Sequence, residues 1–250
     1  MNCLIEICCG DIESVIAAAN GGADRIELCS ALSEGGLTPS AGLIAEAVRC
    51  GSPVNVLIRP RRGDFIYSKA ETEVMLHDIR TAATLGANGI VAGALNADGS
   101  IDTYTCKCLI SEAKSHGLEV TFHRAFDMCA DPYVALEAII HLQADRILTS
   151  GLAATALEGA ETLRKLRETA CGRIKIMAGC GVSPDNISEI LIRTGVGEIH
   201  ASAKKSIGSS MIFRNESAKM GNEDSDEFSR TITSEKTVRQ LVEIIHNHES

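Results

Sequence analysis

The sequence predicts an α/β fold in which eight strands alternate with helices, a (β/α)₈ TIM barrel built as a single domain. Two patterns predict it: eight short apolar runs alternate with amphipathic segments, and most connections between them are short. The third observation is size, because 250 residues that are 45% hydrophobic suit one large core. An open, doubly wound sheet is the alternative arrangement.

The predicted strands are short runs in which apolar residues alternate with polar or small ones, the period of a β-strand. In chain order they are residues 3–8, 24–28, 54–59, 89–93, 118–122, 145–150, 173–178 and 197–202. The segment ADRIEL at 23–28 recurs as ADRILT at 144–149, in the second and sixth strands. A repeat four units apart is what a duplicated half-barrel would produce.

The helices are predicted between these strands from apolar residues spaced three and four apart, as at Ile12, Val15, Ile16 and Ala19. Three of them are expected to begin where a capping side chain precedes a proline. These starts are Thr38-Pro39, Asp131-Pro132 and Ser183-Pro184. Gly86, Gly117 and Gly195 are expected to end helices, because glycine readily adopts the left-handed conformation of a C-terminal cap.

Residues 204–233, between the eighth strand and the last helix, form a long polar segment that departs from the short-loop pattern. A segment of this length is either a functional loop or disordered. We expect it to be ordered at least in part. Its apolar residues Met211, Ile212, Phe213 and Met220 are then expected to cover the barrel mouth or a subunit contact.

The composition indicates which kinds of partner the protein can bind and in which cellular compartment it is expected. The net charge of −9 opposes binding to nucleic acid or to an anionic membrane surface. No apolar run approaches the roughly 20 residues of a membrane span, and the start MNCLIEICCG lacks the pattern of a secretory signal. Ten cysteines without a CxxC pair predict reduced thiols rather than a disulfide framework or zinc knuckle. A cytoplasmic location is therefore expected.

Strand alternation predicts which side chains point into the barrel, because the outward face must pack against helices. Glu6 and Cys8 point inward from the first strand, and Glu27 and Cys29 do so from the second. These matched E-x-C motifs are expected to lie side by side. Further inward residues are Arg59, His123 and His200.

Glu6, Glu27, Arg59, His123 and Arg124 are expected to converge at the carboxyl ends of the strands, where barrels carry their active sites. Within this cluster at least one Glu–Arg pair should lie at hydrogen-bonding distance, because unpaired buried charge is costly. The simpler interpretation is purely structural. In it Arg25, Arg59 and Lys175 neutralise Glu6, Glu27 and Glu198.

The functional interpretation is an enzyme acting on a small anionic or phosphorylated metabolite by proton transfer of the lyase or isomerase type. His123 is the candidate general acid or base, with Glu6 or Glu27 as its partner. The other candidate ligand-binding residues are Arg59, Arg61 and Arg124 as an anion clamp, Asp64 and Asp127 to orient it, and Ser150, Gly179, Gly181 and His200. No lysine ends a strand inside the site, which disfavours a Schiff-base aldolase. A barrel that binds a ligand without turnover is a third possibility.

Several longer motifs resemble those of the CutC family of copper homeostasis proteins. They are IEICC, GADRIELCS, EGGLTPS at 34–40, IRPRRGDFIYS at 58–68, TFHRAFD at 121–127, LTSG at 148–151 and FRN at 213–215. The resemblance runs from end to end of the chain. It departs from the family pattern at Arg62, which replaces a glycine, and at Cys180, which interrupts a run of glycines.

The resemblance implies a cytoplasmic (β/α)₈ barrel that assembles as a homodimer or homotetramer and takes part in copper homeostasis. It also implies that Cys8 and Cys29, which correspond to the family's proposed copper ligands, bind Cu(I), an ion that favours soft thiolates. No organic cofactor is expected.

Overall fold

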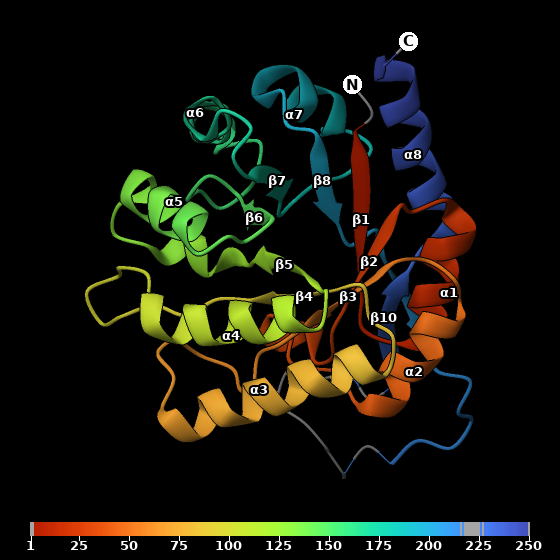
Figure 1. The fold of residues 1–250 in the computed structure, drawn as a ribbon. Coiled ribbons are helices and arrows are strands. Elements are labelled where there is room, and N and C mark those ends of the chain that lie inside the picture. The colour runs from red at the N-terminus through yellow and green to blue at the C-terminus, as the bar shows by residue number, and fades with distance from the viewer. Residues whose placement is uncertain (1–2, 216, 218–225, 227, 250) are drawn as a thin grey trace.

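The computed structural model describes residues 3–215, 217, 226 and 228–249, and its core is a closed barrel of parallel strands paired in chain order, β1 to β8 (Figure 1). The strands are β1 (Leu4–Cys9), β2 (Arg25–Leu28), β3 (Val54–Leu57), β4 (Gly89–Ala92), β5 (Glu119–Phe122), β6 (Arg146–Thr149), β7 (Lys175–Gly179) and β8 (Glu198–Ala201). The predicted (β/α)₈ fold is confirmed, and β1 closes the barrel by pairing with β8.

Helices follow the strands and form the outer layer of the barrel (Figure 1). They are α1 (Ile12–Gly21), α2 (Ala41–Arg49), α3 (Lys69–Thr84), α4 (Thr103–Ser115), α5 (Pro132–His141), α6 (Ala160–Ala170), α7 (Ile187–Thr194) and α8 (Glu235–Glu249). Two 3₁₀ helices, η1 (Leu32–Glu34) and η2 (Arg124–Met128), lie in the loops after β2 and β5. None of the helices in the described ranges is long and apolar enough to cross a membrane.

The helix ends agree only in part with the predicted ones. Asp131 caps α5 with Pro132 in the first turn, as predicted. The Thr38-Pro39 start is wrong, because Ser40 caps α2 while the Thr38 hydroxyl accepts the backbone N–H of Arg59. The Ser183-Pro184 start is also wrong.

Helix α7 begins at Ile187, since the backbone N–H of Ser183 donates to the Asn186 side chain and that segment forms a turn. The predicted glycine ends are confirmed. Gly86, Gly117 and Gly195 follow helices α3, α4 and α7 with φ of 89°, 75° and 63°.

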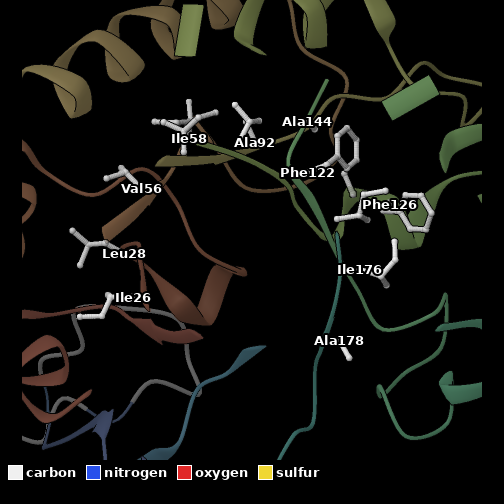
Figure 2. Close-up of a cluster of buried hydrophobic side chains, with 14 of the residues drawn as sticks. Ile26, Leu28, Val56, Ile58, Ala92, Phe122, Phe126, Ala144, Ile176 and Ala178 are labelled. Carbon is white, nitrogen blue, oxygen red and sulfur yellow. The ribbon is translucent and has the colours of Figure 1, made fainter. Parts of the chain in front are cut away.

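The outward faces of the strands pack against the helices and form the main apolar core. Ile26 and Leu28 of β2 and Val56 of β3 are completely buried there, as predicted from strand alternation. Figure 2 shows these side chains in one cluster with Ile58, Phe122 and Ile176. Because the apolar residues of each strand point outward, the polar residues between them point into the barrel.

The register between β1 and β2 differs from the one that the matched motifs predict. Glu6 lies opposite Arg25, and Cys8 lies opposite Glu27, so the two E-x-C motifs are staggered by two residues. The expectation that Glu6 lies directly beside Glu27 is therefore wrong, whereas the expected neighbourhood of the two thiols is confirmed by the 3.6 Å between the sulfurs of Cys8 and Cys29. Closing a parallel sheet into a barrel requires the strands to tilt and their register to shift. This stagger places an arginine beside the buried carboxylate of Glu6.

The two ends of the 204–233 segment are ordered and pair with each other. Strands β9 (Lys204–Gly208) and β10 (Ser229–Thr233) form an antiparallel pair that packs on α1, where the backbone N–H of Thr233 donates to Oγ of Ser14 at 3.0 Å. Within the described part of the chain, Met211, Ile212 and Phe213 are exposed rather than packed over the barrel mouth. Met220 lies outside the described residues.

Candidate functional site

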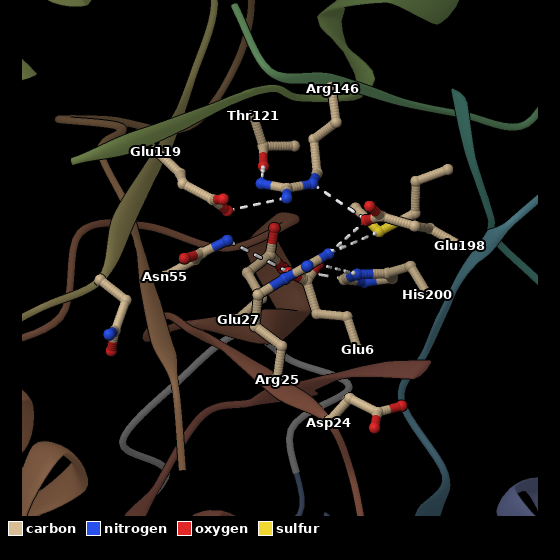
Figure 3. A network of polar contacts seen from close by, with 12 residues as sticks. Glu6, Asp24, Arg25, Glu27, Asn55, Glu119, Thr121, Arg146, Glu198 and His200 are labelled. Atoms are coloured by element: carbon tan, nitrogen blue, oxygen red, sulfur yellow. Dashed lines mark hydrogen bonds and ion pairs between the residues drawn. The ribbon is translucent and has the colours of Figure 1, made fainter. Parts of the chain in front are cut away.

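A network of buried ion pairs fills the middle of the barrel (Figure 3). Nε of Arg25 donates to Oε2 of Glu6 at 2.6 Å, and Nη2 of Arg25 donates to Oε2 of Glu198 at 2.7 Å. Arg146, a fully buried side chain, donates through Nε to the same Glu198 oxygen at 2.9 Å. The Glu–Arg pair predicted within the cluster is not among the ion pairs of the described residues, because Glu6 pairs with Arg25 and Arg124 pairs with Asp127. The simpler structural interpretation is confirmed for Arg25 and Lys175, which pair with Glu6 and Glu198. Each buried charge thus has a partner that offsets its desolvation.

The repeated segment explains two of these arginines. Asp24 accepts the backbone N–H of Ile5, and Asp145 accepts that of Val120, so each aspartate ties its strand to the preceding one. The next residue in each repeat, Arg25 or Arg146, then points into the barrel. Sequence reasoning did not select Arg146, although the repeat was a signal that could have found it.

A cavity of about 310 Å³ opens above this network, at the carboxyl ends of the strands. Of the predicted site residues, those that line it are Cys8, Glu27, Arg59, His123, Arg124, Gly181 and His200. Glu6 is completely buried beneath it. Phe65, Ser202 and Lys204 also line the cavity and were not predicted. Lys204 comes from the start of β9, a strand whose position depends on tertiary pairing.

Two thiols meet at the inner wall of the cavity. Sγ of Cys8 lies 3.6 Å from Sγ of Cys29, and both are free thiols, since a disulfide bond would bring the sulfurs to about 2.05 Å. Cys8 lines the cavity, whereas Cys29 is completely buried behind it. The hydrogen bond with Cys29, together with burial, raises the pKa of the Cys8 thiol well above its usual value. Cys8 is therefore protonated in the free protein.

His200 lies between two carboxylates. Its Nδ1 is 2.9 Å from Oε1 of Glu6, and its Nε2 is 3.7 Å from Oε2 of Glu27. Burial alone would raise the pKa of Glu6, but the hydrogen bond with His200 and the charge of Arg25 outweigh it and lower this pKa to about 2. Glu6 is thus ionised, and its Oε1 accepts a hydrogen bond from the Nδ1–H of His200.

The same contacts act on the partners of Glu6. Burial opposes the charged imidazolium, but the nearby Glu27, Cys8 and Glu6 raise the pKa of His200 well above its usual value. Burial raises the pKa of Glu27. The histidine that is paired with a carboxylate is therefore His200, whereas the sequence interpretation gave that arrangement to His123.

His123 is a buried neutral histidine on the opposite side of the cavity. Its Nδ1 accepts the backbone N–H of Ala125 at 3.2 Å, so the ring proton resides on Nε2. Burial, together with the positive charge of Arg59, lowers the pKa of His123 to about 3. Among the described residues, Nε2 has no hydrogen-bond partner. The ring can donate one hydrogen bond to a ligand at neutral pH.

Arg59 holds two loops together instead of pairing with a carboxylate. Nη1 donates to the carbonyls of Glu34 at 3.0 Å and Gly36 at 2.9 Å, and Nη2 donates to that of Gly63 at 2.8 Å. The simpler structural interpretation is therefore wrong for Arg59, which donates to backbone carbonyls and not to Glu6, Glu27 or Glu198. The reason is that the loops after β2 and β3 bring three backbone carbonyls to its guanidinium.

Arg124, Asp127 and Ser150 form one cluster beside the cavity. Nε of Arg124 donates to Oδ2 of Asp127 at 2.8 Å, and the backbone N–H of Ser150 donates to both oxygens of Asp127. Arg124 lines the cavity, whereas Asp127 and Ser150 do not. Asp127 therefore connects η2 to the loop after β6.

The remaining predicted residues lie away from the cavity wall. Arg61 pairs with Glu71 at 2.5 Å and with Asp64 at 3.1 Å on the outside of the loop after β3. Gly179 lies opposite His200 in the sheet, and a Cβ there would come within 2.5 Å of the Leu148 side chain. Gly179 thus allows close packing, while Gly181, with φ of 70°, reaches the cavity itself.

The chain has close relatives of known family. The CutC family profile matches residues 3–205. A CutC family protein of Vibrio cholerae serotype O1 is 51% identical over 239 residues, covering 95% of this chain and 94% of that protein. One from Bacteroides fragilis is 49% identical over 247 residues, covering 98% of both chains.

Solved structures agree with this relationship. A crystal structure from Streptococcus agalactiae, described provisionally as the copper homeostasis protein CutC, is 34% identical with a TM-score of 0.75 and covers 79% of this chain and 97% of its own. Phosphoribosylanthranilate isomerase from Thermotoga maritima, 10% identical with a TM-score of 0.58 over 99% of this chain and 100% of its own, shares the barrel fold alone. On the extent and identity of these matches, the chain belongs to the CutC family.

Proposed function

We propose that this protein handles copper in the cytoplasm and binds one Cu(I) ion between Cys8 and Cys29. The observation that carries the proposal is the 3.6 Å separation of the two sulfur atoms. Cu(I) favours soft thiolate ligands. With the roughly 2.3 Å metal–sulfur distance of a zinc thiolate as a guide, one ion can join sulfurs up to about 4.6 Å apart. The thiols need little movement to accept it.

The position of the pair suits an ion that enters and leaves. Cys8 lines the cavity and gives access from solvent, while Cys29 is enclosed by Cys8 and by the apolar side chains of Leu57 and Val91. Binding must displace the thiol protons, because only the thiolate is a good ligand. The provisional copper homeostasis description of the Streptococcus agalactiae relative is consistent with this proposal.

The test is Cu(I) binding by the reduced protein in competition with a Cu(I) chelator. We expect one tight Cu(I) per chain, and we expect the Cys8→Ser and Cys29→Ser variants to lose it. Cys180→Ser is the matched control, because Cys180 also lines the cavity but belongs to neither thiol of the pair. Cu(I) held equally well by the Cys8→Ser, Cys29→Ser double variant would contradict the paired-cysteine proposal.

A second candidate function is catalysis by proton transfer on a small anionic metabolite in the same cavity. It is supported by the unpartnered Nε2 of His123 and by the cations Arg124 and Lys204 on the cavity wall. The direct test is mass spectrometry of small molecules that co-purify with the protein. In that case His123→Ala should abolish retention of the ligand, whereas the double serine variant should retain it.

A further inference from the structure

A second set of metal-ligating side chains shares Cys8 with the thiol pair. One ligand atom each from Cys8, Glu27 and His200 lies within 4.8 Å of the other two, and all three line the cavity. They come from three different strands, β1, β2 and β8, which are neighbours in the closed barrel. We propose that Cys8, Glu27 and His200 form a site for a divalent ion, Zn²⁺, with one coordination position open to the cavity.

The distances fit an ion of this kind. Zinc binds thiolate sulfur at about 2.3 Å, imidazole nitrogen at about 2.0–2.1 Å and carboxylate oxygen at about 2.0–2.2 Å, which in a tetrahedron separates the ligand atoms by roughly 3.3–3.6 Å. Nε2 of His200 and Oε2 of Glu27 are 3.7 Å apart. Since the three ligand atoms lie within 4.8 Å of one another, they need to approach by at most about 1.5 Å.

The imidazole is held in the orientation that a metal ligand requires. Nδ1 of His200 donates to Oε1 of Glu6, which leaves Nε2 as the ring atom directed towards Glu27. Glu6 is itself held by Nε of Arg25 at 2.6 Å and by Nδ2 of Asn55 at 3.5 Å. A carboxylate that accepts the second ring proton of a ligating histidine is the usual support of a zinc site.

The mixed ligand set distinguishes this site from the thiol pair. A sulfur, a nitrogen and an oxygen donor together suit a borderline divalent ion, whereas Cu(I) favours thiolates alone and Mg²⁺ or Ca²⁺ favours oxygen. The Cys8 thiolate and the Glu27 carboxylate would balance the two positive charges. Three protein ligands with an open fourth position are typical of zinc sites that bind water or a substrate group.

The experiment is titration of the reduced protein with Co²⁺ and with Zn²⁺ under a competing chelator. We expect one Zn²⁺ per chain, a Co²⁺ complex with a thiolate-to-metal absorption band, and a rise in the unfolding temperature on adding Zn²⁺. Glu27→Gln, which keeps the side-chain shape, and His200→Gln should each weaken Zn²⁺ binding at least tenfold. Glu6→Gln should weaken it by roughly 10- to 100-fold through the orientation of His200.

The controls separate this site from the proposed Cu(I) site. Cys29→Ser should lose Cu(I) but retain Zn²⁺, His200→Gln should lose Zn²⁺ but retain Cu(I), and Cys8→Ser should lose both. Cys180→Ser and Glu119→Gln, a carboxylate at the other end of the barrel, should retain Zn²⁺. If His200→Gln does not fold, Glu27→Gln decides the question. Unchanged Zn²⁺ affinity in Glu27→Gln, absence of the thiolate band with Co²⁺, or loss of Zn²⁺ on Cys29→Ser would overturn the proposal.

Discussion

Nε of Arg25 lies 2.6 Å from Oε2 of Glu6 on the neighbouring strand, inside the barrel. The stagger between β1 and β2 creates this pair, since it replaces the expected Glu6–Glu27 contact with a contact between opposite charges. Arg25 is 7% exposed and Glu6 is completely buried, so neither charge can turn to water if the other is removed.

Replacement of Arg25 by Met should therefore destabilise the protein strongly. The carboxylates of Glu6 and Glu198 would lose a shared partner, and breaking a buried pair in this way costs about 3–5 kcal/mol. Urea unfolding of the variant and the wild type measures the loss. The control is Arg173→Met, because Arg173 and Glu137 form an exposed pair that contributes at most about 1 kcal/mol. Equal effects of the two substitutions would contradict the prediction.

His123 should make stability depend on pH. The pKa of His123 is lowered to about 3 in the folded protein, against 6.5 for the ordinary side chain. Between pH 6.5 and pH 3, this histidine binds a proton in the unfolded chain but not in the folded chain. The free energy of unfolding therefore falls as pH falls from 6.5 towards 3.

Comparison with His123→Gln isolates this effect, because glutamine cannot be protonated and can still accept the Ala125 N–H. The difference in unfolding free energy between the two proteins should change by about 1.4 kcal/mol per pH unit below pH 6. His77→Gln, on the exposed face of α3, is the matched control for the loss of a histidine. A constant difference from pH 6.5 to 4 would show that His123 is not held neutral.

Arg59 should prove to be a structural residue whose shape matters more than its charge. Its guanidinium donates to three backbone carbonyls at once, a geometry that the single ammonium of lysine cannot reproduce. Arg59→Lys should lower the unfolding free energy by about 2 kcal/mol, since the buried carbonyl of Gly36 and two partly buried carbonyls lose their donor. It should also speed proteolysis in the loop after β3. Arg49→Lys, at an exposed pair with Glu46, should do neither; full stability of Arg59→Lys would refute this role.

The exposed apolar residues of the long segment should mediate self-association. Ile212 is 99% exposed and Phe213 is 75% exposed, and adjacent apolar side chains on a surface commonly mark a contact site. We expect a homodimer or homotetramer by light scattering after size-exclusion chromatography. The Ile212→Asp, Phe213→Asp double variant should shift it towards the monomer, whereas Tyr104→Asp, at a residue that is 80% exposed on α4, should not. An unchanged mass would exclude these residues from the contact.

The sequence by itself determined the barrel and the direction of its side chains. Apolar residues at every second position identified the eight strands. The same alternation correctly directed Glu6 and Cys8 into the barrel, and Ile5 and Ile7 outward against the helices. It could do so because the outward face of each barrel strand must be apolar to pack against helices, a requirement that acts within a few residues of chain. The same local logic identified Asp131 as a helix cap.

Only the tertiary structure decided which inward residues meet. Closure of the barrel sets the register between β1 and β2, and it is this register that pairs Glu6 with Arg25. Pairing of β1 with β8 brings His200 to Glu6 across 194 positions of sequence. The guanidinium of Arg59 donates to three loop carbonyls rather than to a carboxylate. These contacts depend on strand stagger and loop path, which are properties of the closed sheet as a whole. No local pattern of residue types encodes them.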